Sequence, residues 1–170
     1  TNDDDLAEMM RIVVNHGMKV RYYHDYIGVN SRLDAIQAAV LDIKLKHLDE
    51  YIAARQHVAA YYEAAFAQTD KIITPKTAPF TDHVFHQYVV VLNGIEREKA
   101  MAHLQSKGIA SAIYYPVPLH MQKAYKDARY KEGDFPVCEH LCEHVLALPI
   151  HTEFTDEQLK YVTESLLELC

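Results

Sequence analysis

The sequence predicts an α+β domain that combines several helices with a small antiparallel sheet. Three observations indicate this class. Apolar residues recur at helical spacing in several segments. Two short runs read as strands, and one of them alternates in polarity before it ends in β-branched residues. The order of helix, long helix, strand, helix, strand and helices is typical of an α+β layer.

Composition and charge exclude several classes of function. The formal net charge of −7 argues against a nucleic-acid-binding protein, although a local site can still bind a small anion. No apolar run is long enough to cross a bilayer, and the first residues do not resemble a signal peptide. The three cysteines, Cys138, Cys142 and Cys170, do not form the even set of a secreted disulfide framework. The cytoplasm is therefore the expected compartment.

The N-terminal segment predicts a helix followed by an ordered loop. Asp3 to Asp5 suit the N-cap and first turn of a helix that ends near Gly17. A sequence that begins almost directly with a helix is compatible with a natural start and also with a chain cut from a longer one. Residues 18–28 are aromatic and basic with no clean period, which is typical of an ordered loop.

Residues 33–66 predict a long helix, or two helices with a bend between them. Apolar residues such as Leu33, Ile36 and Val40 recur at helical spacing up to Phe66, and no proline interrupts them. A helix of this length cannot bury its whole apolar stripe against a small domain. We expect it to pack on another domain or another subunit.

The next residues predict the first strand of the sheet. A connection punctuated by prolines at 69–82 leads to a strand at 83–93. His86 and Tyr88 share one face of that strand, and the histidine reads as a satisfied core residue. An amphipathic helix follows at 95–108 and ends at a glycine.

The last third of the chain predicts one more strand and two helices. The strand covers 109–115 and ends at two prolines. A short helix over 135–148 leads into a third proline, and a final helix covers 155–169. Thr155 and Gln158 form the capping box of that final helix.

The segment Cys-Glu-His-Leu-Cys-Glu-His suggests a metal site, but its spacing argues against one. Cys138 and Cys142 are four residues apart, as are His140 and His144, so each pair shares a helix face. The two pairs lie roughly 200° apart around a helix and cannot converge on one ion. We therefore expect no metal, with the cysteines on a buried face and the histidines and glutamates in water.

The segment Tyr-Tyr-Pro-Val-Pro-Leu-His is a candidate binding site. Tyr114 and Tyr115 end a predicted strand, Pro116 and Pro118 stiffen the chain after them, and His120 follows. Loops after strand ends commonly carry ligand-binding groups. Composition alone favours the alternative, in which the tyrosines pack at a domain edge and His120 makes a local turn bond.

The turn before the long helix carries a second candidate pair, Asn30 and Arg32. Asparagine is common in turns because its side chain caps free backbone donors. Its amide also donates, and the planar guanidinium of arginine suits phosphate or carboxylate, especially near a helix N-terminus. The residues alone leave both interpretations open.

No motif identifies a reaction on its own, since the sequence lacks a glycine-rich phosphate loop and the common hydrolase and zinc motifs. Two blocks nevertheless point to a family. They are Gly-x-Asn-x-Arg-x-x-x-x-Gln-Ala-Ala at 28–39 and Leu-Pro-Ile-His at 148–151. With the segments at 83–90 and 108–125, they resemble the C-terminal part of the DegT/DnrJ family. The resemblance covers residues 1–168.

Members of that family are sugar aminotransferases that depend on pyridoxal phosphate and have the fold of the aspartate aminotransferase (fold type I) superfamily. The resemblance implies that residues 1–32 are the tail end of the large cofactor domain with an active-site loop. It implies a long connecting helix at 33–67 and a small C-terminal α+β domain at 68–170.

The resemblance also implies which residues act. The lysine that binds the cofactor lies shortly upstream of the position where this chain begins, so we expect no catalytic residue here and no transamination by this fragment alone. Lys19, Lys44 and Lys46 stand in the wrong context to replace it.

The implied binding residues are the two candidate groups described above. Asn30 would reach across a dimer interface to the cofactor phosphate of the neighbouring subunit, and Arg32 would contact an anionic part of the substrate. Tyr114, Tyr115 and His120 would line the substrate side. Many relatives have His-Tyr-Pro here, so the chain departs from the family pattern at Tyr114.

The implied reaction moves an amino group from an amino acid, commonly glutamate, to a keto-sugar carried on a nucleotide. The loop at 21–34 looks most like members that act on UDP-linked 3-keto sugar acids of surface-polysaccharide pathways. Two alternatives remain: a member that has lost catalysis and binds cofactor or sugar nucleotide in a regulatory role, and a stand-alone domain that dimerises through its long helix.

Overall fold

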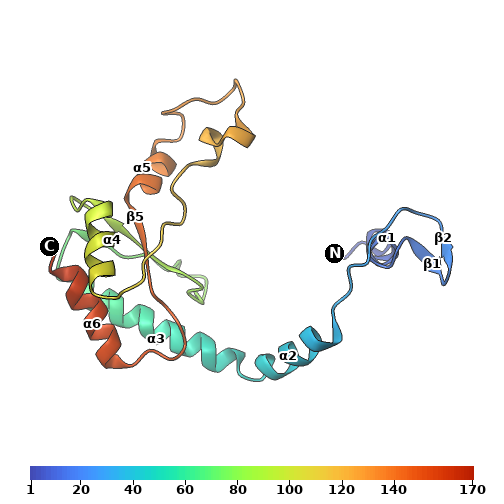
Figure 1. Ribbon diagram of the computed structural model, residues 1–170, viewed down its shortest axis with the longest axis horizontal. Coiled ribbons are helices and arrows are strands. Elements are labelled where there is room, and N and C mark those ends of the chain that lie inside the picture. The colour runs from blue at the N-terminus through green and yellow to red at the C-terminus, as the bar shows by residue number, and fades with distance from the viewer. The chain divides into compact units, whose positions relative to one another are not determined.

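The computed structural model describes residues 1–170 and divides into two compact units, Thr1–Leu48 and Asp49–Cys170. Figure 1 follows the chain from the blue N-terminus to the red C-terminus. The α+β class with small antiparallel sheets is confirmed. The boundary between the two units falls inside the predicted connecting helix. The three-part division at 1–32, 33–67 and 68–170 stays a prediction.

The first unit begins with helix α1, Asp4–Val14, as the acidic residues predict. The side chain of Asp3 caps the helix by accepting the amide of Leu6 at 2.9 Å. The helix ends where the Gly17 amide donates to the carbonyl of Ile12 at 2.9 Å. These local rules place both ends of the helix correctly.

Residues 18–28 are more regular than the predicted loop. Strands β1, Met18–Val20, and β2, Tyr23–His24, pair antiparallel as a short hairpin. Strands of three and two residues are too short to show a period, which is why the pattern reads as a loop.

Of the two predicted alternatives, one long helix or two helices, the structure has two: α2 at Ala35–Leu45 and α3 at Leu48–Phe66. The amides of Lys46 and His47 donate to carbonyls three residues earlier, so the chain tightens into a turn between them. No residue of α2 is buried, whereas the second half of α3 lies in the core of the second unit.

The second unit is built on a three-stranded antiparallel sheet in the order β3-β4-β5. Its strands are β3, Ile72–Ile73, β4, Tyr88–Leu92, and β5, Val145–Leu148. In the register of the sheet, Ile72 pairs with Leu92, and Val89 pairs with Ala147.

Three sequence predictions for this sheet are wrong. The central strand starts at Tyr88, so His86 lies outside it and is exposed instead of buried in the core. Strand β3 lies inside the segment predicted as connection. The predicted helix at 135–148 ends early, because its last four residues are strand β5, all of them buried. A short apolar run of that kind cannot be assigned to helix or strand by periodicity.

The predicted strand at 109–115 is reduced to one bridge. Ala112 and Ala147 exchange two backbone hydrogen bonds of 3.2 and 2.8 Å. The chain then leaves the sheet through the short 3₁₀ turns η1, Leu119–Met121, and η2, Lys123–Tyr125. In Figure 1 this segment rises away from the sheet and returns through helix α5, Pro136–His144, into β5.

Helices α4, Arg97–Ser106, and α6, Asp156–Leu167, complete the core. The core cluster joins side chains of α3, the sheet, α4 and α6. The predicted capping box of α6 is present, with Thr155 and Gln158 bonded in both directions. The longest helix, α3, is too polar to span a lipid bilayer, and the other helices are too short.

Candidate functional site

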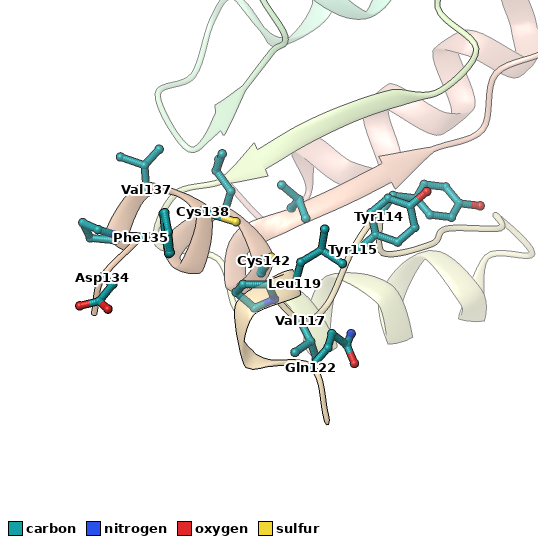
Figure 2. Close-up of a pocket in the computed structure, with 14 residues that line it drawn as sticks. Tyr114, Tyr115, Val117, Leu119, Gln122, Asp134, Phe135, Val137, Cys138 and Cys142 are labelled. Atoms are coloured by element: carbon teal, nitrogen blue, oxygen red, sulfur yellow. The ribbon is translucent and has the colours of Figure 1, made fainter. Parts of the chain in front are cut away.

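A large cavity of the second unit lies between α5 and the segment that follows Ala112. Its volume is about 880 Å³. Figure 2 shows Val137, Cys138 and Cys142 along α5, with Val117 and Leu119 facing them from the loop. Helix α5 and a proline-containing loop thus frame an open, mainly apolar hollow.

Tyr114 and Tyr115 stand at one end of this cavity (Figure 2). Their ring centroids are 5.8 Å apart in an edge-to-face arrangement. The other polar groups on the wall belong to Gln122 and Asp134. The cavity therefore offers a few hydrogen-bonding groups on an apolar surface, which is the usual make-up of a small-molecule site.

Tyr114 also borders a smaller hollow of about 260 Å³. That hollow is more polar and includes His86, Gln87 and Ser111. Tyr114 therefore contributes to the lining of both spaces.

The cysteines of α5 line the cavity and do not form the buried face that the sequence predicted. Cys138 is exposed and Cys142 is half-buried. Burial raises the pKa of the Cys142 thiol, helped by the neighbouring Cys138, so the thiol is protonated at neutral pH. The rings of His140 and His144 stack 4.1 Å apart on the same helix. No group of three or more His, Cys, Asp or Glu side chains is arranged to hold a metal ion.

His120 does not line this cavity. Its side chain is 9% exposed, and its Nε2 lies 3.0 Å from Oε1 of Glu139. Its ring also packs on Phe135, with the centroids 4.8 Å apart. His120 borders a separate hollow of about 460 Å³ on the outer side of the loop. It is thus bonded to α5 and makes no local turn bond.

Glu139 is the centre of a hydrogen-bond network that the sequence analysis missed. Its carboxylate accepts the Gly133 amide at 3.0 and 2.9 Å and the Phe135 amide at 3.2 Å, besides the contact with His120. Burial alone would raise the pKa of Glu139, but these hydrogen bonds outweigh it and lower the pKa. The prediction that the glutamates of this helix lie in water is wrong for Glu139.

Arg97 and Arg55 are further structural residues that the sequence did not reveal. Arg97 Nη1 donates to the carbonyl of Cys142 at 2.5 Å and so caps the C-terminal end of α5. Arg55 Nη1 donates to the carbonyls of Phe85 and His86 at 3.2 and 3.3 Å. Both contacts join residues far apart in sequence, so no local pattern signals them. For Glu139 the signal was an acid in the first turn of a helix.

The first unit carries the other predicted pair, and it brings Asn30 and Arg32 together. Nε of Arg32 donates to Oδ1 of Asn30 at 3.1 Å, and both residues are exposed. The backbone around them is fixed, because Val29 and Ser31 donate to carbonyls at the end of α1 at 2.8 and 3.0 Å. The pair therefore stands on a rigid support.

Gly28 explains how the chain passes so close to α1. A Cβ added there would lie 2.2 Å from the amide nitrogen of Gly17 and 2.5 Å from the carbonyl oxygen of Val13. Only glycine permits this approach. The glycine thus brings Asn30 against the end of the helix.

Comparison with known proteins identifies similar chains over nearly the whole length. The sequence profile of the DegT/DnrJ/EryC1/StrS aminotransferase family matches residues 1–167. The pleiotropic regulatory protein of Geobacillus stearothermophilus is 42% identical over 170 residues. The UDP-2-acetamido-2-deoxy-3-oxo-D-glucuronate aminotransferase of Pseudomonas aeruginosa is 39% identical over 166 residues. The matches cover 99% and 98% of this chain and 45% of each relative.

A solved structure with the same fold is that of DesV from S. venezuelae in complex with a ketimine intermediate. It has a TM-score of 0.89 and 39% sequence identity, covering 99% of this chain and 45% of DesV. The chain thus spans less than half the length of these relatives.

Proposed function

The chain belongs to the DegT/DnrJ/EryC1/StrS aminotransferase family, and from this membership we propose that the protein transfers an amino group from an amino acid to a nucleotide-linked keto-sugar. The expected fold, that of the C-terminal part of such enzymes, is confirmed by the likeness to DesV. The match over residues 1–167 is the observation that carries the proposal. Glutamate is the proposed donor, and surface polysaccharide the proposed destination of the amino sugar.

The cofactor that this chemistry requires is pyridoxal phosphate, and the residues present fit its phosphate group. Oδ1 of Asn30 is occupied by Arg32 at 3.1 Å, which leaves the amide N–H groups of Asn30 and the terminal nitrogens of Arg32 as donors. The absence of a side chain at Gly28 permits the close packing of the backbone behind them. Several donors presented together on a fixed backbone suit phosphate oxygens.

We assign Asn30 to the cofactor phosphate and Arg32 to an anionic part of the sugar nucleotide. When bound, pyridoxal phosphate would supply the electron sink that allows nitrogen to move between the two substrates. The side chain of Asn30 would donate hydrogen bonds that hold the phosphate. Arg32, with its planar fork, would orient a carboxylate or phosphate of the substrate. The carboxylate of a uronate would fit that role. We therefore propose a UDP-linked 3-keto sugar acid as the substrate.

Tyr114 and Tyr115 are the proposed substrate residues of the second unit. The two residues line one end of an apolar cavity large enough for part of a nucleotide sugar. Their rings would exclude water and stack against the ligand, and their hydroxyls would donate to its oxygens. His120 has an indirect part in this proposal, because its ring packs behind the cavity wall.

The first test uses the complete protein and measures cofactor affinity. Replacing Asn30 by Ala should weaken binding of pyridoxal phosphate about tenfold, since one lost hydrogen bond to a charged group is worth roughly 1.5 kcal/mol. Ser31→Ala, in the same exposed turn, is the matched control and should leave the affinity unchanged. Borohydride reduction followed by mass spectrometry would locate the lysine that binds the cofactor. Equal affinities for N30A and wild type would refute the assignment of Asn30.

A second function is favoured by one relative, the Geobacillus stearothermophilus protein described as a pleiotropic regulatory protein. In that alternative the protein binds cofactor or sugar nucleotide without transferring nitrogen. The two functions separate in one assay. Amino transfer from glutamate to a UDP-linked 3-keto sugar supports the enzyme, whereas ligand binding without turnover supports the regulator.

A further inference from the structure

Glu139 has an environment that surface helix residues rarely have. It lies in the first turn of α5, a helix in which no residue is fully buried, yet its side chain is only 18% exposed. An acid at this position normally faces water. Its enclosure therefore requires a specific set of partners.

Those partners come from two separate stretches of the loop. The backbone amides of Gly133 and Phe135 lie just before α5, while His120 lies in the 3₁₀ turn η1. One carboxylate thus ties both stretches to the helix with charge-assisted hydrogen bonds. Without it, two amides and one imidazole would lose their acceptor.

The stretches held by Glu139 form a wall of the large cavity. Leu119, next to His120, and Phe135, whose amide bonds Glu139, both line that cavity. Asp134, between the two bonded amides, lines it as well. Glu139 does not line the cavity, so any effect on a ligand must pass through these residues.

We propose that Glu139 is a positioning residue that fixes the wall formed by Leu119, Asp134 and Phe135 and so sets the affinity of the cavity for the sugar nucleotide. The role in substrate binding rests on the function proposed above. The bonding of the loop to α5 does not depend on that function.

The test compares Glu139→Gln, which keeps the shape and removes the charge, with Glu139→Ala and with Glu143→Gln. Glu143 lies one turn further along the same helix and is exposed, which makes it the matched control. In the complete protein, hydrogen exchange at the amides of Gly133 and Phe135 should accelerate about tenfold in E139Q and more in E139A. E143Q should match the wild type.

The second readout separates positioning from general stability. With a UDP-linked 3-keto sugar as substrate, E139Q should raise KM about tenfold and leave kcat within about twofold, the pattern of lost uniform binding. Unchanged exchange in E139Q, or an equal effect in E143Q, would overturn the proposal. Faster exchange with an unchanged KM would overturn the positioning role and leave a structural contact. Absence of turnover in the wild type would refute the proposed function, while exchange would still test the bonding by Glu139.

Discussion

The candidate binding residues depend on backbone contacts made by their neighbours. Asn30 is exposed, but Val29 and Ser31 on either side donate to carbonyls at the end of α1. The position of Asn30 is therefore set before any ligand arrives, and only its partner Arg32 restrains its side chain. A polar group held this way loses little conformational entropy when it binds.

Cys138 can report directly on the large cavity. It is exposed and lines the cavity, while Cys170 is exposed at the C-terminus and does not. If the cavity binds the sugar nucleotide, ligand at ten times its Kd should slow alkylation of Cys138 about tenfold. Mass spectrometry of the iodoacetamide-labelled peptides measures both rates in one sample. Equal slowing at Cys170, or no slowing at Cys138, would contradict ligand binding in this cavity.

Glu139 also predicts a dependence of stability on pH. Its pKa in the folded protein lies below the ordinary value of 4.5, because its hydrogen bonds outweigh the effect of burial. Its stabilisation is therefore fully present above about pH 4.5 and is lost as the pH falls through the lowered pKa. Wild type should have a higher Tm than E139Q at pH 6, and the gap should narrow as the pH falls from 6 through the lowered pKa of Glu139. A gap that is constant over this range would exclude a role for the charge.

At the scale of helices and strands, N-cap side chains determine where two of the helices begin. Both α1 and α6 begin at a side chain that accepts an amide three residues on, Asp3 in one case and Thr155 in the other. In α6 the bond is reciprocal, since the amide of Thr155 donates to Gln158 at 3.0 Å. That helix supplies several residues of the core, so its start affects the packing of the whole second unit.

Thr155→Ala should lower the free energy of unfolding by about 1 kcal/mol, the usual cost of a lost N-cap. Thr155→Ser keeps the hydroxyl and should stay within a few tenths of a kcal/mol of the wild type. Urea unfolding of the complete protein, followed at a probe in the second unit, measures the difference. Equal losses in both variants would show that the methyl group, and not the cap, matters.

The same elements show what a sequence can and cannot predict here. Asp3 and Thr155 were predictable because capping depends on residues three positions apart. The buried strand at Val145–Leu148 was not, since its neighbours in the sheet, and not its own period, decide its conformation. Glu139 was missed for a related reason: His120, nineteen residues away, completes its partners. Asn30 and Arg32 were predictable as a pair, but their mutual bond was not.

For the molecule as a whole, the two units differ in how much apolar surface they bury. In Thr1–Leu48, Ile12 is the one buried apolar residue, while every other member of the buried apolar set lies in Asp49–Cys170. Helix α2 is apolar around most of its circumference, yet none of its residues is buried. A helix of that composition is normally enclosed by protein. We therefore expect either another domain of the complete protein or a second subunit to cover α2, and we propose the second subunit of a homodimer.

Ile36, Val40 and Ile43 define one side of α2, since they recur at helical spacing, and they are 82%, 50% and 61% exposed. Val40→Asp would place a charge in the proposed interface, where desolvation without a partner costs several kcal/mol. We expect the complete protein to elute as a dimer and V40D to shift toward the monomer at micromolar concentration, as measured by light scattering after size exclusion. Asp42→Asn, an exposed polar position on the same helix, should remain dimeric. A monomeric wild type, or a V40D variant as dimeric as D42N, would mean that α2 is covered by something other than a second subunit.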